Sequence, residues 1–206
     1  MGTPPKSLVL ATGNAGKVAE LTDLFRDLPF ELKSLRDFEQ ILDIDETGST
    51  FRENAELKAR GFAMQTGHLS LADDSGLEIE ALGNAPGVHS ARFAGSSAGY
   101  DVKIPKLLAA LRATGDASRR ARFVCVMALA DPDGRVVYSA EGVCNGSIAF
   151  SPRGKNGFGY DPIFSPDGFD MTFGELGDNI KRSVSHRAKA AELIIRYLLD
   201  FIAPLT

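Results

Sequence analysis

Apolar residues occur along the chain in two patterns, continuous or alternating runs that predict strands and helically spaced stripes that predict helices. The runs that predict strands lie at 7–11, 30–35, 69–72, 122–130 and 135–150. The stripes that predict helices lie at 18–28, 50–65, 106–113 and 185–202. Pro105 is expected at the start of the third of these helices, because proline is favoured at the first helical position.

Local signals refine two of these elements. Thr50 and Glu53 match a capping box, so the second helix is expected to begin there. Residues 131–134 read Asp-Pro-Asp-Gly, which is typical of a turn. We therefore expect the strands on either side of this turn to form a long hairpin.

The segment 69–81 carries the most distinctive candidate chemistry. Its apolar run ends in Asp73 and Asp74, Ser75 and Gly76 predict a turn, and the apolar alternation then resumes. Two adjacent carboxylates repel each other, so a site that keeps both ionised needs a cation nearby, and carboxylate oxygens suit Mg²⁺. A solvated turn explains the same residues, because Asp-Ser-Gly is ordinary turn chemistry.

A glycine-containing turn at 12–17 joins the first strand to the first helix. Backbone N–H groups and the positive end of a helix meet in such a turn, which favours an anion. Lys17 can add a charge, and Thr12 and Asn14 can add hydrogen bonds. The spacing is neither that of a Walker A motif nor that of the dinucleotide fingerprint, and a plain connection is the alternative.

Three other features are candidates for contact with a ligand. Asn54 and Lys58 lie four residues apart and share a helix face, where the lysine either covers apolar surface or points at an anion. Phe158 lies between two glycines, where it can stack on a flat ring or pack in the core. His186 and Arg187 place cations in the first turn of the last helix. Because they oppose the helix dipole, a bound anion or a carboxylate should compensate them.

Composition and charge narrow the classes of partner. A length of 206 residues suggests one domain, with room for two lobes. The net charge of −4 and the pI of about 5.4 disfavour a nucleic acid polymer as partner.

Cys125 and Cys144 lack metal-ligand spacing and are expected to be reduced core thiols of a cytoplasmic protein. We find neither a secretory signal nor an apolar run that could span a membrane.

Taken together, the motifs resemble those of the non-canonical purine nucleoside triphosphate pyrophosphatases, the dITP/XTP pyrophosphatases of the Ham1/RdgB type. The motifs that carry this resemblance lie at 12–17, 46–55, 73–77, 157–162 and 185–187. It implies an α/β protein with the ITPase-like fold, which has a long mixed β-sheet, flanking helices and two lobes around a central cleft. It further implies a single catalytic domain over residues 1–206, with a short disordered N-terminal extension at 1–6.

The resemblance also implies an activity and its residues. The reaction is the hydrolysis of dITP, ITP or XTP to the monophosphate and pyrophosphate, by a cytoplasmic homodimer that uses Mg²⁺. Asp74 is then the proton acceptor and, with Glu46 and Asp73, a metal ligand. The residues expected to contact the substrate are Thr12, Gly13, Asn14, Ala15, Gly16, Lys17, Asn54, Lys58, Ser75, Phe158, Gly159, Tyr160, Asp161, Lys181, His186 and Arg187. One departure is Arg182 after Lys181, where the family often has asparagine.

Two other classes of function stay open. A different metal-dependent phosphatase would use the same acidic segment and lysines but release orthophosphate. A nucleotide-binding module without catalysis would need Asp73 and Asp74 only as a turn. A serine or cysteine hydrolase is disfavoured, because His68, His89 and His186 lie in unrelated contexts and no GxSxG elbow is present.

Overall fold

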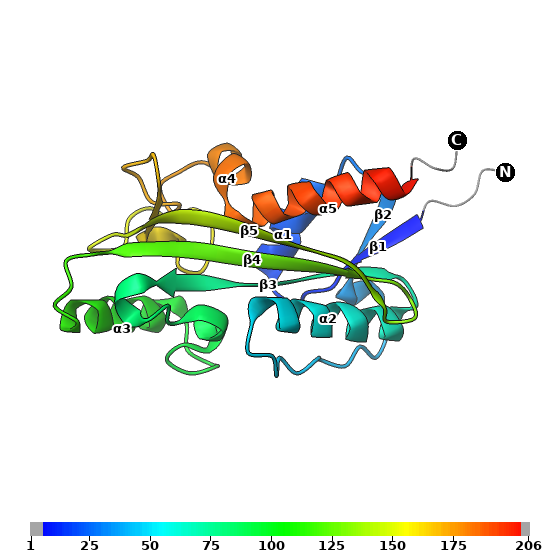
Figure 1. Ribbon diagram of the computed structural model, residues 1–206, viewed down its shortest axis with the longest axis horizontal. Coiled ribbons are helices and arrows are strands. Elements are labelled where there is room, and N and C mark those ends of the chain that lie inside the picture. The colour runs from blue at the N-terminus through cyan, green and yellow to red at the C-terminus, as the bar shows by residue number, and fades with distance from the viewer. Residues whose placement is uncertain (1–5, 203–206) are drawn as a thin grey trace. The chain divides into compact units, whose positions relative to one another are not determined.

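The computed structural model describes residues 6–202 of the chain. The strands are β1 (Lys6–Leu10), β2 (Phe30–Ser34), β3 (Leu69–Ile79), β4 (Arg120–Ala130), β5 (Val136–Ile148) and β6 (Phe164–Pro166) (Figure 1). The α-helices are α1 (Ala15–Phe25), α2 (Phe51–Thr66), α3 (Tyr100–Ala113), α4 (Asp178–Val184) and α5 (His186–Ile202). Of the N-terminal extension predicted at 1–6, residues 1–5 lie outside the described residues and Lys6 is the first residue of β1.

The strands form one six-stranded sheet in the order β2-β1-β3-β4-β5-β6. β1 pairs in parallel with both of its neighbours, placing Lys6 opposite Phe30 and Leu8 opposite Leu69. β5 and β6 pair in antiparallel fashion. The predicted mixed sheet with flanking helices is therefore confirmed. Within the described part of the chain, no helix has the length and apolar character needed to cross a membrane.

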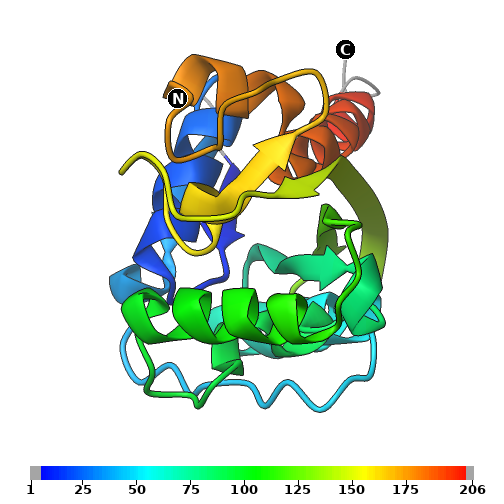
Figure 2. The same ribbon diagram turned by 90° about the vertical axis from the view of Figure 1, so that its left-hand side faces the viewer.

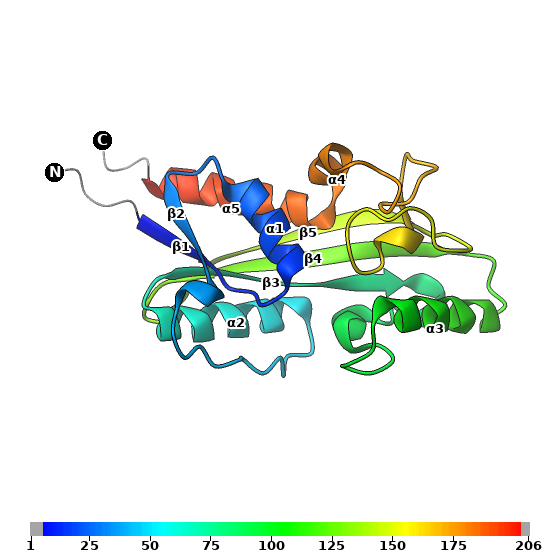
Figure 3. The ribbon, with the colours of Figure 1, turned by 180° about the vertical axis from the view of Figure 1, so that it is seen from behind.

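Contacts within the chain divide it into two compact units, and β3, β4 and β5 each pass from one unit to the other. The first unit holds the chain up to Asp74, Cys125–Glu141 and the chain from Lys189 onward. Its α1 and α5 cover one face of the strands, and α2 covers the opposite face (Figures 1 and 3). The core under α1 and α5 is built from Leu8, Leu10, Leu21, Phe25, Leu71, Met127, Leu129, Ile194 and Leu198.

The second unit holds Ser75–Val124 and Gly142–Ala188. Its helices α3 and α4 lie on opposite sides of its strands (Figure 2). Three aromatic rings, those of Phe123, Phe164 and Phe173, pack against one another in its core. Further core residues are Leu77, Ile79, Ile104, Leu107, Leu111, Cys144, Ile148 and Ile163.

The predicted turn at Asp73–Gly76 is wrong, because β3 runs through it as a single strand of 11 residues. Asp73 and Asp74 are both buried, with 1% and 6% of their surface exposed. Turn-forming residues tolerate extended backbone, and both carboxylates have basic partners inside the fold. The two carboxylates therefore do not have to be hydrated, and β3 continues through them as a buried strand.

The predicted start of α3 at Pro105 is also wrong, because the helix begins at Tyr100 and contains Pro105 in its interior. The N–H groups of Val102 and Lys103 donate to the carbonyl of Gly99, which fixes the first turn. A proline at the sixth helical position removes one backbone hydrogen bond. Buried side chains farther along α3 hold the helix against the core despite that loss.

Two local predictions are confirmed. The Thr50 hydroxyl accepts from the N–H of Glu53 at 3.1 Å, and the Glu53 carboxylate accepts from the N–H of Thr50 at 3.1 Å, which is the capping box of α2. β4 and β5 are joined by the predicted turn, in which the N–H of Asp131 donates to the carbonyl of Arg135 at 3.0 Å. Gly134 has a φ of +78° in this turn, a conformation that favours glycine.

Candidate active site

Two lysines and three carboxylates gather around β3 in the first unit. Lys17 Nζ lies 3.0 Å from Asp73 Oδ2. Lys58 Nζ lies 2.6 Å from Glu46 Oε1 and 3.2 Å from Asp74 Oδ1. The aspartates are buried and the lysines largely so, which means that water and salt screen these interactions weakly.

The two aspartates are directed to different helices. Neighbouring residues of a strand point to opposite faces of the sheet. Asp73 accordingly meets Lys17 in the first turn of α1, and Asp74 meets Lys58 on α2, which covers the other face (Figure 1). The structure thus provides a lysine as the compensating cation for each carboxylate.

Asn54 fixes the orientation of Asp74. Its side chain is fully buried, and its Nδ2 donates to Asp74 Oδ2 at 3.2 Å. Its Oδ1 accepts from the N–H of Gly48 at 2.8 Å. A Cβ on Gly48 would lie 2.6 Å from the Cβ of Glu53, so the loop that carries Glu46 approaches α2 this closely only with glycine. Both ends of the Asn54 amide are therefore engaged by the protein.

The protonation behaviour of this cluster follows from burial and charge. Burial raises the pKa of Asp74 and Glu46 adds to the rise, whereas Lys58 and Lys17 oppose it only in part. Burial acts to lower the pKa of Lys58, but Asp74, Asp73 and Glu46 outweigh it and raise that pKa. Lys58 therefore stays charged near neutral pH, while Asp74 holds a proton more tightly than an ordinary carboxylate. A raised pKa suits a proton acceptor that works near neutral pH.

The donor set of this cluster fits a hard divalent cation. Glu46 and Asp74 each direct an oxygen at one cationic position, which the Lys58 ammonium holds here. The described residues contain no group of three or more histidine, cysteine or carboxylate side chains placed to hold a metal. Mg²⁺ is commonly bound by only one or two carboxylates together with substrate phosphates, so the Glu46–Asp74 pair meets its requirement. Asp73 is held apart from this pair by Lys17, and Cys125 Sγ lies 3.8 Å from its Oδ2.

The 12–17 turn has the geometry expected of an anion site. Asn14 caps α1 by accepting from the N–H of Lys17 at 3.1 Å, and its own N–H donates to Thr12 Oγ1 at 3.3 Å. A Cβ on Gly13 would meet nothing within 4 Å, so the backbone is open on that side. The first N–H groups of α1, at Ala15 and Gly16, cannot be paired within the helix. The turn thus brings together helix donors that have no partner within α1 and the Lys17 side chain.

A second set of predicted residues comes together in the second unit. Lys181 Nζ lies 2.6 Å from Asp161 Oδ2, and both side chains are buried. The same oxygen accepts from the N–H of Phe158 at 2.8 Å, and Lys181 Nζ lies 4.9 Å from the centre of the Phe158 ring. Gly157 has a φ of +71°, and a Cβ there would collide with the Asp161 carboxylate. The Asp161–Lys181 pair therefore determines where Phe158 is held, half-buried rather than in the core.

The start of α5 completes this set. Arg187 is 2% exposed, and its Nη2 donates to Ser75 Oγ at 2.8 Å. Its guanidinium lies 5.6 Å from the centre of the Phe158 ring. His186 stacks on Phe123, with ring centres 4.7 Å apart. Arg187 and Ser75 both belong to the second unit, and Ser75 directly follows Asp74 in the chain.

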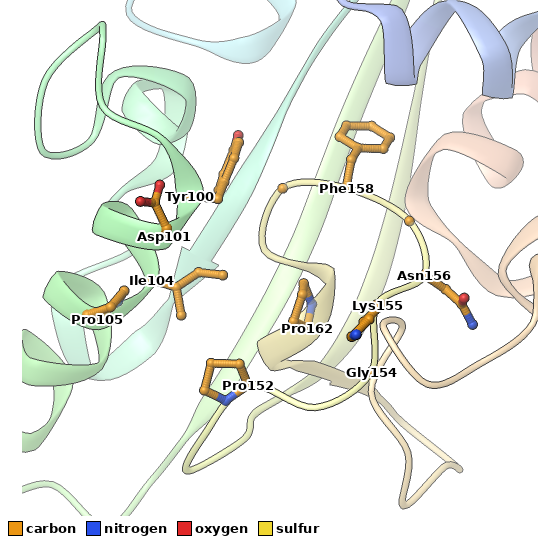
Figure 4. Close-up of a pocket in the computed structure, with 12 residues that line it drawn as sticks. Tyr100, Asp101, Ile104, Pro105, Pro152, Gly154, Lys155, Asn156, Phe158 and Pro162 are labelled. Atoms are coloured by element: carbon orange, nitrogen blue, oxygen red, sulfur yellow. The ribbon is translucent and has the colours of Figure 1, made fainter.

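Sequence reasoning missed one residue of this region. Tyr100 lines a cavity of about 370 Å³ together with Phe158, and Figure 4 shows the two side chains on opposite sides of it. The sequence predicts a helix that begins only at Pro105, so Tyr100 lies outside the predicted helix. Gly99 is the residue that could have signalled the earlier start, because glycine is favoured as a helix N-cap.

Comparison with known proteins agrees with the fold and the motifs. The sequence model of the Ham1 family matches residues 8–197. The chain is 47% identical over 187 residues to the dITP/XTP pyrophosphatase of Synechococcus sp. (strain CC9311), an alignment that covers 91% of this chain and 87% of the relative. It is 46% identical over 191 residues to the dITP/XTP pyrophosphatase of Desulforamulus reducens, covering 93% and 94%.

A solved structure is similar over almost the whole chain. The HAM1 protein from Coxiella burnetii superposes with a TM-score of 0.87 and 46% sequence identity, covering 95% of this chain and 99% of that one. Sequence and fold therefore agree over nearly the same residues, and the chain belongs to the Ham1 family.

Proposed function

We propose that this protein hydrolyses the non-canonical purine nucleoside triphosphates dITP, ITP and XTP to the nucleoside monophosphate and pyrophosphate, which removes them from the nucleotide pool. The names and the high identity of the relatives support this reaction. The observation that carries it is the buried Asp74, held between Lys58 and Asn54 with a raised pKa. A carboxylate in that state can accept a proton and is oriented by neighbours that do not titrate near neutral pH.

The chemistry follows from the roles of these side chains. Asp74 accepts the proton of the water that attacks phosphorus. Lys17, Lys58 and the first N–H groups of α1 neutralise the charge that develops on the leaving pyrophosphate. Asn54 keeps Asp74 in position, and Asp73 does the same for Lys17.

Magnesium fits this arrangement because hard oxygen donors already converge at the Lys58 ammonium. Glu46 and Asp74 would hold the ion. When bound, it supplies positive charge to the phosphates and helps to orient them. We give Asp73 a supporting place, because its carboxylate is engaged by Lys17.

Selection of the base is the task that we assign to the second unit. Phe158 offers a ring on which a purine can stack, and Lys181 and Arg187 place hydrogen-bond donors near that ring. His186, which precedes Arg187 in the chain, is the third donor that we assign to the base. Donors suit the 6-keto oxygen of hypoxanthine or xanthine. Adenine presents an amino group there, and donors left unpaired can lower the rate for a wrong substrate by on the order of 10⁴-fold.

A product assay tests the proposal. Purified protein is incubated with dITP, ITP, XTP, GTP and ATP, each with and without Mg²⁺, and pyrophosphate and orthophosphate are measured separately. We expect pyrophosphate, released selectively from the inosine and xanthosine nucleotides and only with the metal. Orthophosphate as the product would favour a different phosphatase, and binding without turnover would favour a nucleotide-binding module.

We further propose a cytoplasmic homodimer. Two buried cysteines outside any disulfide are typical of a reducing compartment, and the acidic net charge disfavours a nucleic acid polymer as partner. The dimer rests on the family resemblance alone. Light scattering during size-exclusion chromatography measures the mass, and a value near the 22.0 kDa of one chain would contradict it.

A further inference from the structure

The cavity beside Phe158 has a second aromatic wall. Its volume of about 370 Å³ is near the lower end of the range for small-ligand sites, enough for a flat ring system but not for a whole nucleoside triphosphate. Phe158 lines it from the glycine-rich segment, and Tyr100 lines it from the first residue of α3 (Figure 4). A Cβ on Gly159 would lie 3.6 Å from Tyr100 Cζ, so the absent side chain of Gly159 keeps this space open.

The Tyr100 ring is held firmly in place. It packs edge-on against Tyr160, with ring centres 5.1 Å apart and an interplanar angle of 88°. The ammonium of Lys103 lies 4.9 Å from its centre. Lys103 is itself buried, and its Nζ donates to the carbonyl of Ala91 at 2.6 Å. Tyr100 is therefore a fixed wall rather than a mobile surface side chain.

The hydroxyl of Tyr100 is available to a ligand. Tyr160 donates its hydroxyl to the carbonyl of Ser90 at 3.2 Å, whereas the Tyr100 hydroxyl forms no hydrogen bond with any of the described residues. A tyrosine that is partly buried usually has a partner for its hydroxyl. Burial and the nearby Asp161 raise the pKa of Tyr100, so the group stays neutral and can both donate and accept.

We propose that Tyr100 is a specificity-determining residue that contacts the purine base, its ring forming the wall opposite Phe158 and its hydroxyl bonding to a polar group on the base edge. This inference rests on the proposed function, because it assumes a purine nucleotide as ligand. Phe158 stacks with any base, since every base has a flat face. A fixed hydroxyl, in contrast, distinguishes one pattern of keto and amino groups from another.

The test compares Tyr100→Phe, which removes only the hydroxyl, with Tyr100→Ala, which also removes the wall. Tyr138→Phe is the matched control, because it deletes a hydroxyl from a ring stacked on Tyr197 in the first unit. Steady-state kinetics are measured with ITP, XTP and GTP at saturating Mg²⁺. One lost hydrogen bond corresponds to about a 3- to 10-fold effect.

For Tyr100→Phe we expect KM for ITP or XTP to rise about 3- to 10-fold with kcat within twofold, and the preference over GTP to change. Tyr100→Ala should raise KM further, and Tyr138→Phe should match the unaltered protein. KM within twofold of the unaltered protein in both Tyr100 variants would overturn the proposal. So would an equal fall in kcat for all three nucleotides with KM unchanged, since that indicates a purely structural role.

A binding measurement separates this inference from the proposed reaction. Inosine 5′-monophosphate, the product expected from ITP, is titrated by calorimetry into the same proteins. We expect Kd to rise about 3- to 10-fold in Tyr100→Phe and to stay unchanged in Tyr138→Phe. If the unaltered protein binds the monophosphate but hydrolyses no nucleotide, the proposed function fails and Tyr100 is still tested. Equal Kd values for Tyr100→Phe and the unaltered protein would overturn the inference even where hydrolysis is confirmed.

Discussion

Asp73 and Asp74 are adjacent in β3, yet each is paired with a lysine from a different helix. Lys17 of α1 lies 3.0 Å from Asp73, and Lys58 of α2 lies 3.2 Å from Asp74. The alternation of side chains along a strand gives two neighbouring carboxylates different surroundings. Asp73 can therefore hold Lys17 in place while Asp74 stays available for the proton transfer that we propose for it.

Asp74→Asn should remove turnover without removing the fold. Asparagine keeps the shape of the side chain but cannot accept the proton from the attacking water. We expect kcat to fall by about 10²- to 10⁴-fold, the usual contribution of a general base. The measurement is pyrophosphate release from ITP at saturating Mg²⁺, with circular dichroism as the control for folding. Turnover near that of the unaltered protein would show that Asp74 is not the proton acceptor.

Asp74 makes the stability of the protein depend on pH in a defined direction, and the same substitution removes that dependence. The folded-state pKa of Asp74 is raised by its burial, so the folded state favours the protonated form. The stability that Asp74 contributes is complete below its unfolded-state pKa and is lost as pH rises through the folded-state pKa. Asparagine does not titrate, so urea denaturation should show Asp74→Asn gaining stability relative to the unaltered protein as pH rises from about 4, the unfolded-state pKa of an aspartate, through the folded-state pKa. If the stability of Asp74→Asn instead fell relative to that of the unaltered protein as pH rises, the raised pKa of Asp74 would be contradicted.

Lys58→Met should shift the pH dependence of the reaction upward. Lys58 lowers the pKa of Asp74, so its loss leaves Asp74 beside Glu46 without the intervening charge. We expect kcat/KM at neutral pH to fall by about 10²- to 10³-fold, and the acidic limb of the pH profile to move to higher pH. Lys33→Met is the control, since Lys33 pairs with Glu31 on β2 and its loss removes a lysine charge outside the carboxylate cluster. A lowered but unshifted profile would mean that Lys58 does not act through Asp74.

Patterns of residues predicted most elements but misjudged those whose conformation depends on partners far away in sequence. The capping box at Thr50 and the turn at 131–134 are local signals, and both are confirmed. The turn predicted at Asp73–Gly76 is wrong because the partners of its two carboxylates lie on helices that local sequence does not connect to it. When these lysine partners are not known, two adjacent carboxylates after an apolar run predict a solvent-exposed turn.

The candidate site shows the same limit. The motifs taken in series predict roles for Asp74, Lys58 and Phe158, but spacing could not show that both ends of the Asn54 amide are engaged by the protein. The sequence does not single out Tyr100, because the pattern predicts that α3 begins at Pro105 rather than at Tyr100. Side chains that act through three-dimensional contact, such as Tyr100 against Tyr160, leave no periodic signal in the sequence.

Gly157→Ala should displace Phe158 by disturbing the Asp161–Lys181 ion pair. Gly157 has a φ of +71°, and its new Cβ would collide with the Asp161 carboxylate that holds the Phe158 N–H. Gly168→Ala is the matched control, because its φ of +88° brings similar backbone strain but a Cβ there meets nothing within 4 Å. Both variants should lose about 1–3 kcal/mol of stability, and only Gly157→Ala should raise KM for ITP, by about tenfold. Equal KM values would show that the Asp161 pair does not position the base site.

Glu46→Gln should weaken the response of the enzyme to magnesium more than it weakens the fold. Glu46 and Asp74 are the two carboxylates that share the Lys58 ammonium, and neutralising one of them halves the negative charge available to a divalent cation. We expect the Mg²⁺ concentration that gives half-maximal turnover to rise by about tenfold, with most of kcat recovered at high Mg²⁺, and chelation to abolish turnover in both proteins. Asp43→Asn is the control, because Asp43 is an exposed carboxylate in the same loop and its loss removes the same charge without changing the pair. If the two variants respond to Mg²⁺ alike, the effect is one of general charge, and the metal is not held by Glu46.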